Sequence, residues 1–147
     1  MKIRARAADL VDDYLADLVK ELKEQYAIND IYLFGFSQGA IFTYIAGIKN
    51  HQLYKGIIVF SGAGIFEPLG REQFAPNWLE EKYLEPAKSL RVFISHGTED
   101  QAAKYELGVK SQEVLTGYGY DVTFHSFEGG HTIDSKILKI ALEWINK

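Results

Sequence analysis

Four short strand-like runs, separated by segments with helical spacing, constrain the fold of this 147-residue chain most strongly. A run that is apolar on both faces, such as Gly56–Gly62, is typical of a parallel sheet that helices cover on each side. The four runs are Ile31–Phe34, Gly56–Gly62, Arg91–Gly97 and Val122–Phe127. Strands that alternate with helices form βαβ units with right-handed crossovers. We therefore predict an α/β fold, a three-layer α/β/α sandwich around a sheet of about four parallel strands.

Helices are expected before, between and after these runs. An apolar stripe with helical periodicity covers Ala7–Tyr26, with aspartates near its start and lysines near its end, as the helix dipole favours. The other expected helices are Ala40–Ile48, a short one around Trp78–Tyr83, Ala103–Thr116 and Ser135–Asn146. No repeat or linker divides the chain, so we expect residues 1–147 to form a single domain.

Composition and charge exclude several classes of partner. The formal net charge of −4 comes from scattered acids and bases, with no basic stripe for nucleic acid. The absence of cysteine excludes disulfides and thiolate metal sites, and the histidines lack ligand spacing, so we expect no metal and no cofactor. No apolar stretch is long enough to span a membrane or to act as a signal peptide, which predicts a cytoplasmic protein.

A serine flanked by glycines follows the first strand, in Gly35-Phe36-Ser37-Gln38-Gly39. The G-x-S-x-G pattern at a strand-to-helix junction is a nucleophile elbow, which exposes the serine hydroxyl at the carboxyl end of a sheet. We expect side chains at Gly35 and Gly39 to collide with the neighbouring strand and helix. The backbone N–H of Gln38, at the start of the following helix, would be one oxyanion donor.

Two further residues with catalytic chemistry follow later strands. Asp100 comes after the third strand and His131 after the fourth, so that Ser37, Asp100 and His131 meet at one edge of a parallel sheet. Their order along the chain is that of an α/β-hydrolase triad. In this interpretation Ser37 is the nucleophile, His131 the base and Asp100 the residue that orients the imidazole.

Alternatives remain at each of these positions. Ser37 is also compatible with a turn in a Rossmann-like protein, where Gln38 and Gly39 open an anion-binding helix. Glu99 or Asp134 can replace Asp100 as the acid, and His131 can be a surface loop residue. We interpret His96 as structural, bonded near its strand end, and His51 and His125 as surface or sheet residues.

These residues carry a family resemblance. Gly35 to Ala40, His96-Gly97-Thr98-Glu99-Asp100 and the segment from Val122 through Glu128-Gly129-Gly130-His131 resemble the phospholipase/carboxylesterase family of α/β-hydrolases. That family includes acyl-protein thioesterases and small bacterial esterases. The resemblance runs from about Asp30 to the C-terminus and implies an α/β-hydrolase fold with Ser37, Asp100 and His131 as the triad.

The chain departs from the family pattern at two places. Family members commonly have a Val-Pro pair shortly after the acid, where this chain has Gln101-Ala102-Ala103-Lys104. The family's sheet also begins with further strands, which carry a His-Gly loop that donates the second oxyanion N–H. Nothing similar precedes Ala7. The resemblance therefore implies the C-terminal part of the fold, and we expect either a homodimer through the uncovered edge near Ile31–Phe34 or a shortened product of a longer hydrolase.

The expected function is a serine hydrolase that cleaves a small-molecule or lipid-like acyl ester or thioester. The alternatives are a weak or inactive hydrolase-fold binding protein and a fragment of a longer esterase. The segment from Gly64 to Tyr83 is either an apolar acyl pocket or ordinary packing. As candidate substrate-binding residues we name Phe36, Ile65, Phe66 and Trp78.

Overall fold

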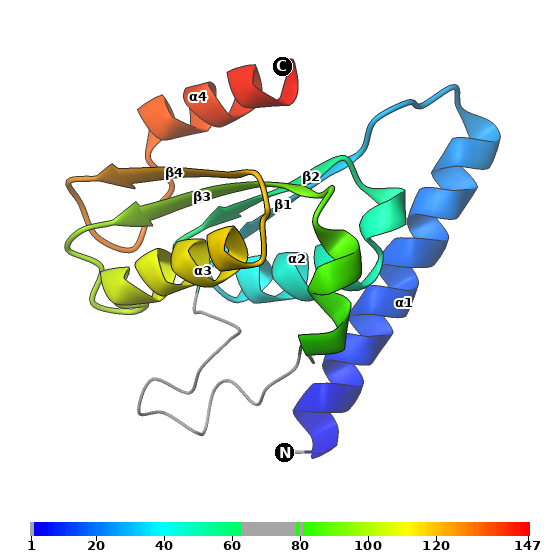
Figure 1. Cartoon of the computed structure of the whole chain (residues 1–147), viewed down its shortest axis with the longest axis horizontal. Coiled ribbons are helices and arrows are strands. Elements are labelled where there is room, and N and C mark those ends of the chain that lie inside the picture. The colour runs from blue at the N-terminus through cyan, green and yellow to red at the C-terminus, as the bar shows by residue number, and fades with distance from the viewer. Residues whose placement is uncertain (1, 63–78, 80) are drawn as a thin grey trace.

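The computed structural model describes residues 2–62, 79 and 81–147, and it has three layers (Figure 1). The sheet contains four strands in the order β1 (Tyr32–Phe36), β2 (Gly56–Phe60), β3 (Arg91–Gly97) and β4 (Val122–Phe127). Every pair of neighbours is parallel. The predicted four-stranded parallel sheet is therefore confirmed, and the carboxyl ends of all four strands lie along one edge.

Helices cover both faces of this sheet (Figure 1). On one face lie α2 (Gln38–Lys49) and α3 (Tyr105–Gly117), and on the other lies α4 (Ser135–Ile145). The long helix α1 (Lys2–Gln25) packs against α2. The predicted three-layer α/β/α sandwich is confirmed.

Several helix boundaries differ from the prediction, among them the start of α2, which is Gln38 in place of Ala40, and the starts of α1 and α3. Helix α1 begins at Lys2 and not at Ala7, because the preceding lysine, isoleucine, arginine and alanine residues tolerate a helix without any apolar stripe. Helix α3 begins at Tyr105 and not at Ala103, because the residues after Asp100 form a turn around its carboxylate. The short helix predicted around Trp78–Tyr83 lies partly outside the described residues; among those described, Glu81–Tyr83 and Glu85–Ala87 form two 3₁₀ turns.

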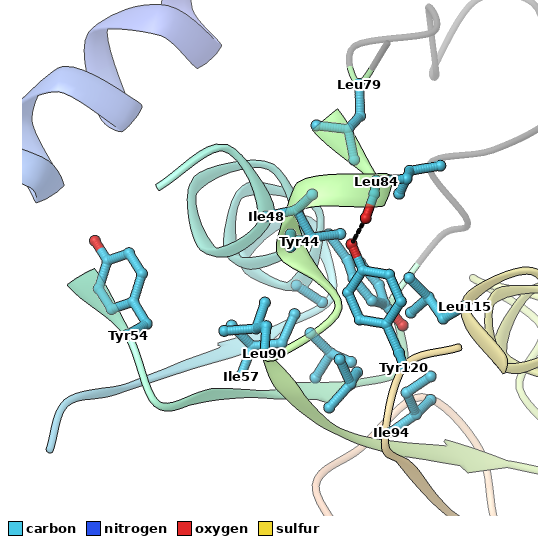
Figure 2. Close-up of a cluster of buried hydrophobic side chains, with 14 of the residues drawn as sticks. Tyr44, Ile48, Tyr54, Ile57, Leu79, Leu84, Leu90, Ile94, Leu115 and Tyr120 are labelled. Carbon is cyan, nitrogen blue, oxygen red and sulfur yellow. Dashed lines mark hydrogen bonds between the residues drawn. The ribbon is translucent and has the colours of Figure 1, made fainter. Parts of the chain in front are cut away.

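The larger core cluster fills the space between the sheet and the α2–α3 layer (Figure 2). Tyr44 and Ile48 of α2 and Leu115 of α3 pack onto Ile57 and Ile94 of the central strands, and all are 2% exposed or less. The phenol of Tyr120 is satisfied inside this cluster, since its hydroxyl donates to the Leu84 carbonyl oxygen at 2.7 Å. Side chains alternate along β2 and β3, and those that point toward α2 and α3 are buried in this cluster.

The side chains of β2 and β3 that point to the other face of the sheet pack against α4. Ile58, Phe60 and Phe93 contact Ala141 and Trp144 in a second cluster. The guanidinium of Arg91 lies 4.2 Å from the Trp144 ring centroid and donates to the Trp144 carbonyl oxygen at 3.2 Å. A cation over an indole face is an attractive contact. These contacts fix the C-terminal helix to the sheet.

Polar contacts join α1 to the end of α2. The carboxylate of Asp12, which is 7% exposed, accepts from Asn50 Nδ2 at 2.6 Å and lies 2.9 Å from Lys49 Nζ. Burial by itself lowers the pKa of Lys49, but the bond and the charge of Asp12 raise it more, so the net pKa lies above its usual value. Asp12 therefore connects the two helices as a paired, buried charge.

Helix α1 and strand β1 each leave apolar side chains exposed to solvent. Leu10, Tyr14 and Leu18 of α1 are 62%, 66% and 38% exposed, and Phe34 of β1 is 47% exposed. Strand β1 is the end strand of the sheet and pairs only with β2 among the described residues. None of the helices in the described residues is long and apolar enough to cross a bilayer.

Candidate active site

Ser37 occupies a sharp turn between β1 and α2. Its backbone φ is 55° and its ψ −119°, a left-handed φ that a non-glycine residue rarely adopts. The turn is held by a bond from the Ser37 N–H to the Phe60 carbonyl oxygen at 3.0 Å. Strained backbone of this kind persists only where the surrounding structure enforces it. The elbow predicted from the sequence is therefore present in the backbone.

The two glycines of the elbow have different roles. A Cβ at Gly35 would collide with the Thr43 side chain and with the Gly39 carbonyl group, so the close approach of β1 to α2 requires glycine there. A Cβ at Gly39 would meet none of the described atoms within 4 Å. The collision predicted at Gly39 is wrong, because a Cβ at this position would point into open space among the described residues.

The structure brings Ser37, His131 and Asp100 together from three loops. The Nε2 atom of His131 lies 2.8 Å from Ser37 Oγ, and its Nδ1 atom lies 2.8 Å from Asp100 Oδ2. A carboxylate only accepts, so Nδ1 carries the proton and Nε2 is free to accept from the serine hydroxyl. The chain of contacts from hydroxyl to imidazole to carboxylate is continuous.

Hydrogen bonds within the loop that carries Asp100 stabilise it, although the loop lacks the Val-Pro pair common in the phospholipase/carboxylesterase family. Asp100 Oδ1 accepts from the backbone N–H groups of Ala102 at 2.9 Å and Ala103 at 2.8 Å. Those residues occupy the segment where the sequence departs from the family pattern. The turn therefore supplies its own support for the carboxylate, with its second oxygen left for His131.

The acid loop and the histidine loop also contact each other directly. The Glu99 N–H donates to the Gly129 carbonyl oxygen at 2.9 Å, and the Thr98 N–H donates to the Phe127 carbonyl oxygen at 2.9 Å. A Cβ at Gly97 would collide with the carbonyl oxygens of Gly129 and Gly130. Glycine at position 97 thus allows the two loops to pack closely enough for Asp100 to reach His131.

Asp100 is 4% exposed and has a lowered pKa. Burial alone would raise this pKa, but the hydrogen bond from His131 and the N–H groups of Ala103 and Ala102 lower it more. The carboxylate is therefore ionised at neutral pH and accepts a hydrogen bond from His131 Nδ1–H.

The other candidate acids and histidines lie elsewhere. Glu99 is exposed, and Asp134 caps α4 by accepting from the N–H groups of Lys136 and Ile137, each at 2.9 Å. His125 of β4 stacks on Phe93, with ring centroids 5.2 Å apart. Asp100 is thus the acid that the fold places against His131. Across the described part of the chain, no group of three or more His, Asp or Glu residues has the geometry to hold a metal ion.

The remaining predicted site residues have different outcomes. Gln38 is the first residue of α2, so its N–H has no intrahelical partner. The Phe36 ring lies against the His131 imidazole, with centroids 4.8 Å apart. Ile65, Phe66 and Trp78, with the pocket predicted around them, lie outside the described residues.

Two supporting features escaped the sequence interpretation. Ser61, after β2, has a φ of 49°, and its hydroxyl lies 3.5 Å from the Thr132 carbonyl oxygen, next to His131. The only sequence signal was its position after a buried strand. The contact of Phe36 with His131 had no local signal, because the two residues are far apart in the chain.

The parallel sheet, the elbow after β1 and the loops that meet beside it define the α/β-hydrolase fold. The crystal structure of SOBER1 from Arabidopsis thaliana is similar, with a TM-score of 0.68 and 27% identity over 94% of this chain and 62% of that one. The crystal structure of esterase PE8 shares the fold, with a TM-score of 0.73 and 24% identity.

The sequence comparisons identify the family. The family model for phospholipase/carboxylesterase matches residues 4–147, so the chain belongs to that family. Acyl-protein thioesterase 1 from Emericella nidulans is 32% identical over 79% of this chain and 46% of its own length. Carboxylesterase SOBER1 from Arabidopsis thaliana is 27% identical over 95% of this chain and 58% of its own length. The chain spans about half the length of the curated relatives it matches.

Proposed function

We propose that this chain is a serine hydrolase that cleaves carboxylic esters or thioesters through an acyl-enzyme. The observation that carries the proposal is the continuous contact from Ser37 Oγ through His131 to Asp100, with 2.8 Å at each step. The names of its relatives, acyl-protein thioesterase and carboxylesterase, support the same reaction class.

In the first half of the reaction Ser37 Oγ attacks the acyl carbonyl carbon while its proton passes to His131 Nε2. Asp100 accepts from Nδ1–H throughout and stabilises the imidazolium, without itself becoming protonated. The tetrahedral oxyanion collapses, and the leaving alcohol or thiol takes the proton from His131. Ser37 is then acylated.

In the second half water attacks the acyl-enzyme and gives a proton to His131 Nε2. The second tetrahedral intermediate collapses to release the carboxylic acid, and Ser37 Oγ recovers the proton. Atoms and charges balance without a cofactor.

The N-terminus of α2 is the proposed site of oxyanion stabilisation. The Gln38 N–H lies at the positive end of the helix dipole, one residue after the proposed nucleophile. Hydrolases of this fold use a second N–H from an earlier loop. Loss of one donor costs about 100- to 1,000-fold in turnover, so slow hydrolysis is expected if Gln38 acts alone.

The proposed substrate is a small-molecule or lipid-like acyl ester. Phe36, Ile65, Phe66 and Trp78 are the residues proposed to contact its acyl chain. A panel of p-nitrophenyl esters of increasing chain length tests this, with a preference for longer chains as the expected result.

A fluorophosphonate probe tests the nucleophile directly, because it labels activated serines without needing a substrate. We expect the wild type to be labelled and Ser37→Ala to be unlabelled. Ser89→Ala, which changes an exposed serine, is the matched control and keeps the label. Labelling of S37A at the wild-type rate would contradict the proposal. A folded wild type that neither takes the label nor hydrolyses esters would support the alternative, a binding protein with a hydrolase fold. The observation that favours this alternative is that only one oxyanion donor, the Gln38 N–H, is identified among the described residues.

We further propose that β1 pairs with a second copy of this chain. Its five residues, Tyr32–Phe36, carry no charge, and Phe34 at this edge is 47% exposed. Two antiparallel copies of one strand form a closed two-fold contact, which protects edges that would otherwise aggregate. Sedimentation should show a dimer that Phe34→Lys dissociates. A wild type that remains a monomer at high concentration would contradict this proposal.

A further inference from the structure

A second imidazole lies behind the proposed triad. His96, near the end of β3, is 0% exposed, and its Nε2 atom lies 2.7 Å from the Ala103 carbonyl oxygen. The same atom is 3.4 Å from Asp100 Oδ2. Both oxygens only accept, so Nε2 carries a proton and points it at the acid loop.

The ring of His96 is held in this orientation by α3. A Cβ at Gly108 would come within 2.6 Å of His96 Nδ1, and the Tyr105 ring packs edge-on at a centroid distance of 6.1 Å. Glycine at position 108 therefore makes room for the imidazole. The helix prevents the ring from turning away from Asp100.

The bond to Ala103 confirms the structural role expected for His96, but packing alone does not account for histidine at this position. Its Nδ1 atom is buried and has no hydrogen-bond partner among the described residues. A buried polar atom without a partner is unfavourable, and an apolar side chain would avoid that cost. What histidine supplies here, and leucine would not, is the Nε2–H donor.

Ala103 links that donor to the carboxylate. Its carbonyl oxygen accepts from His96, while its own N–H donates to Asp100 Oδ1 at 2.8 Å. The bond from His96 restrains Ala103, so that the N–H groups of Ala103 and Ala102 stay directed at Asp100 Oδ1. Oδ2 then faces His131 Nδ1.

We propose that His96 is a positioning residue for Asp100, acting through the backbone of Ala103, whose carbonyl oxygen it fixes and whose N–H binds Asp100, and through its own proximity to Oδ2. The proposal rests on the serine hydrolase function proposed above. His96 does not contact the reacting atoms. Its effect on the reaction passes entirely through Asp100 and then His131.

Three variants separate the donor from the volume. His96→Leu keeps the bulk and removes the donor, and His96→Gln keeps an N–H donor at a similar reach. His125→Leu makes the same change at a histidine of β4 that stacks on Phe93 and serves as the matched control. We expect H96L to lower kcat about 10- to 100-fold. Metal sites show losses of this size when the hydrogen-bond partner of a metal ligand is removed, and His96 supports Asp100 in a similar way. KM should be unchanged, H96Q should recover most of kcat, and H125L should match wild type.

A double-mutant cycle tests the route of the effect. If His96 acts through Asp100, H96L should cost nothing further in an Asp100→Asn background, since residues that act as one unit are not additive. The rate of fluorophosphonate labelling of Ser37 provides the same comparison where turnover is slow. Equal losses from H96L in both backgrounds would overturn the proposal, as would an active H96L with wild-type kcat.

Proton NMR distinguishes failure of this proposal from failure of the hydrolase proposal. The His131 Nδ1–H proton, hydrogen-bonded to Asp100 Oδ2, is expected to resonate far downfield, and its disappearance in His131→Gln would assign it. We expect this resonance to shift or broaden in H96L and to stay in place in H96Q and H125L, whether or not the chain turns over esters. An unchanged resonance in H96L overturns the positioning role. If H96L does not fold, H96Q decides: a displaced resonance or a tenfold loss of kcat contradicts the donor argument.

Discussion

The carboxyl edge of the sheet and the outer surfaces of α1 and β1 differ in how completely their side chains are paired or buried. At the carboxyl edge, Asp100 accepts from two amides and one imidazole and is 4% exposed. On those outer surfaces, Leu10 and Tyr14 are more than 60% exposed, and Phe34 is nearly half exposed. The polar groups of the proposed triad are paired with one another, and apolar side chains of α1 and β1 are left in water.

The contacts that hold the proposed triad lie at the carboxyl ends of the strands and not along the outer edge of β1. The three residues of the triad follow β1, β3 and β4, and the loops that hold Asp100 and His131 contact each other and the end of β2. The outer edge, by contrast, has apolar area available for another polypeptide. Substitutions in the two regions should therefore have different consequences.

The largest effect is expected at the carboxyl edge. Asp100→Asn should lower kcat by about 10,000-fold with the fold intact, because an amide cannot hold His131 in the required tautomer. The check is steady-state ester hydrolysis with circular dichroism of the same sample. A loss below tenfold would show that another acid orients His131.

The same variant has a consequence for acid stability. Because the pKa of Asp100 is lowered in the fold, its ionised form stabilises the protein above about pH 4, its ordinary unfolded pKa, and that stabilisation is lost as pH falls through the folded value. D100N should therefore flatten the pH dependence of the free energy of unfolding below about pH 4. Urea unfolding at several pH values measures this, and parallel curves for the two proteins would contradict it.

A smaller effect is expected where α1 joins α2. Asp12→Asn should lower the free energy of unfolding by about 1.5–3 kcal/mol, because it removes the charge paired with the partly buried Lys49. Asp17→Asn is the matched control, since Asp17 pairs with Lys20 while 80% exposed and should cost about 0.5 kcal/mol or less. Urea unfolding near pH 7 compares them. Equal costs would mean that burial of Asp12 does not matter.

The smallest effect is expected at the start of α4. Asp134→Ala should cost about 1 kcal/mol, because it removes the side chain that accepts from two N–H groups of the first turn. Asp134→Asn keeps an acceptor at this position and should remain close to wild type. Thermal unfolding followed by circular dichroism distinguishes the two variants. A D134N as unstable as D134A would point to lost charge and not to a lost cap.

Local patterns were sufficient for most of the fold. Runs such as Gly56–Gly62 predicted the strands, because a strand covered on both faces must be apolar throughout. The turn Gly35–Gly39 predicted the elbow for an equally local reason, since few residue types fit a sharp strand-to-helix turn. The boundary of α3 was missed because side chain to backbone bonds from Asp100 compete with the helix at its first turn.

By itself the sequence determined the order of the elements, the parallel sheet and the edge at which Ser37, Asp100 and His131 gather, because periodicity and turn chemistry are encoded within a few neighbouring residues. Only the tertiary structure decided that Asp100, and not Glu99 or Asp134, faces His131. It also decided that Ala102 and Ala103 replace a missing Val-Pro pair, and that His96 lies behind them. These contacts depend on how closely loops from different strands approach one another, and a local sequence pattern does not predict the distance between two loops.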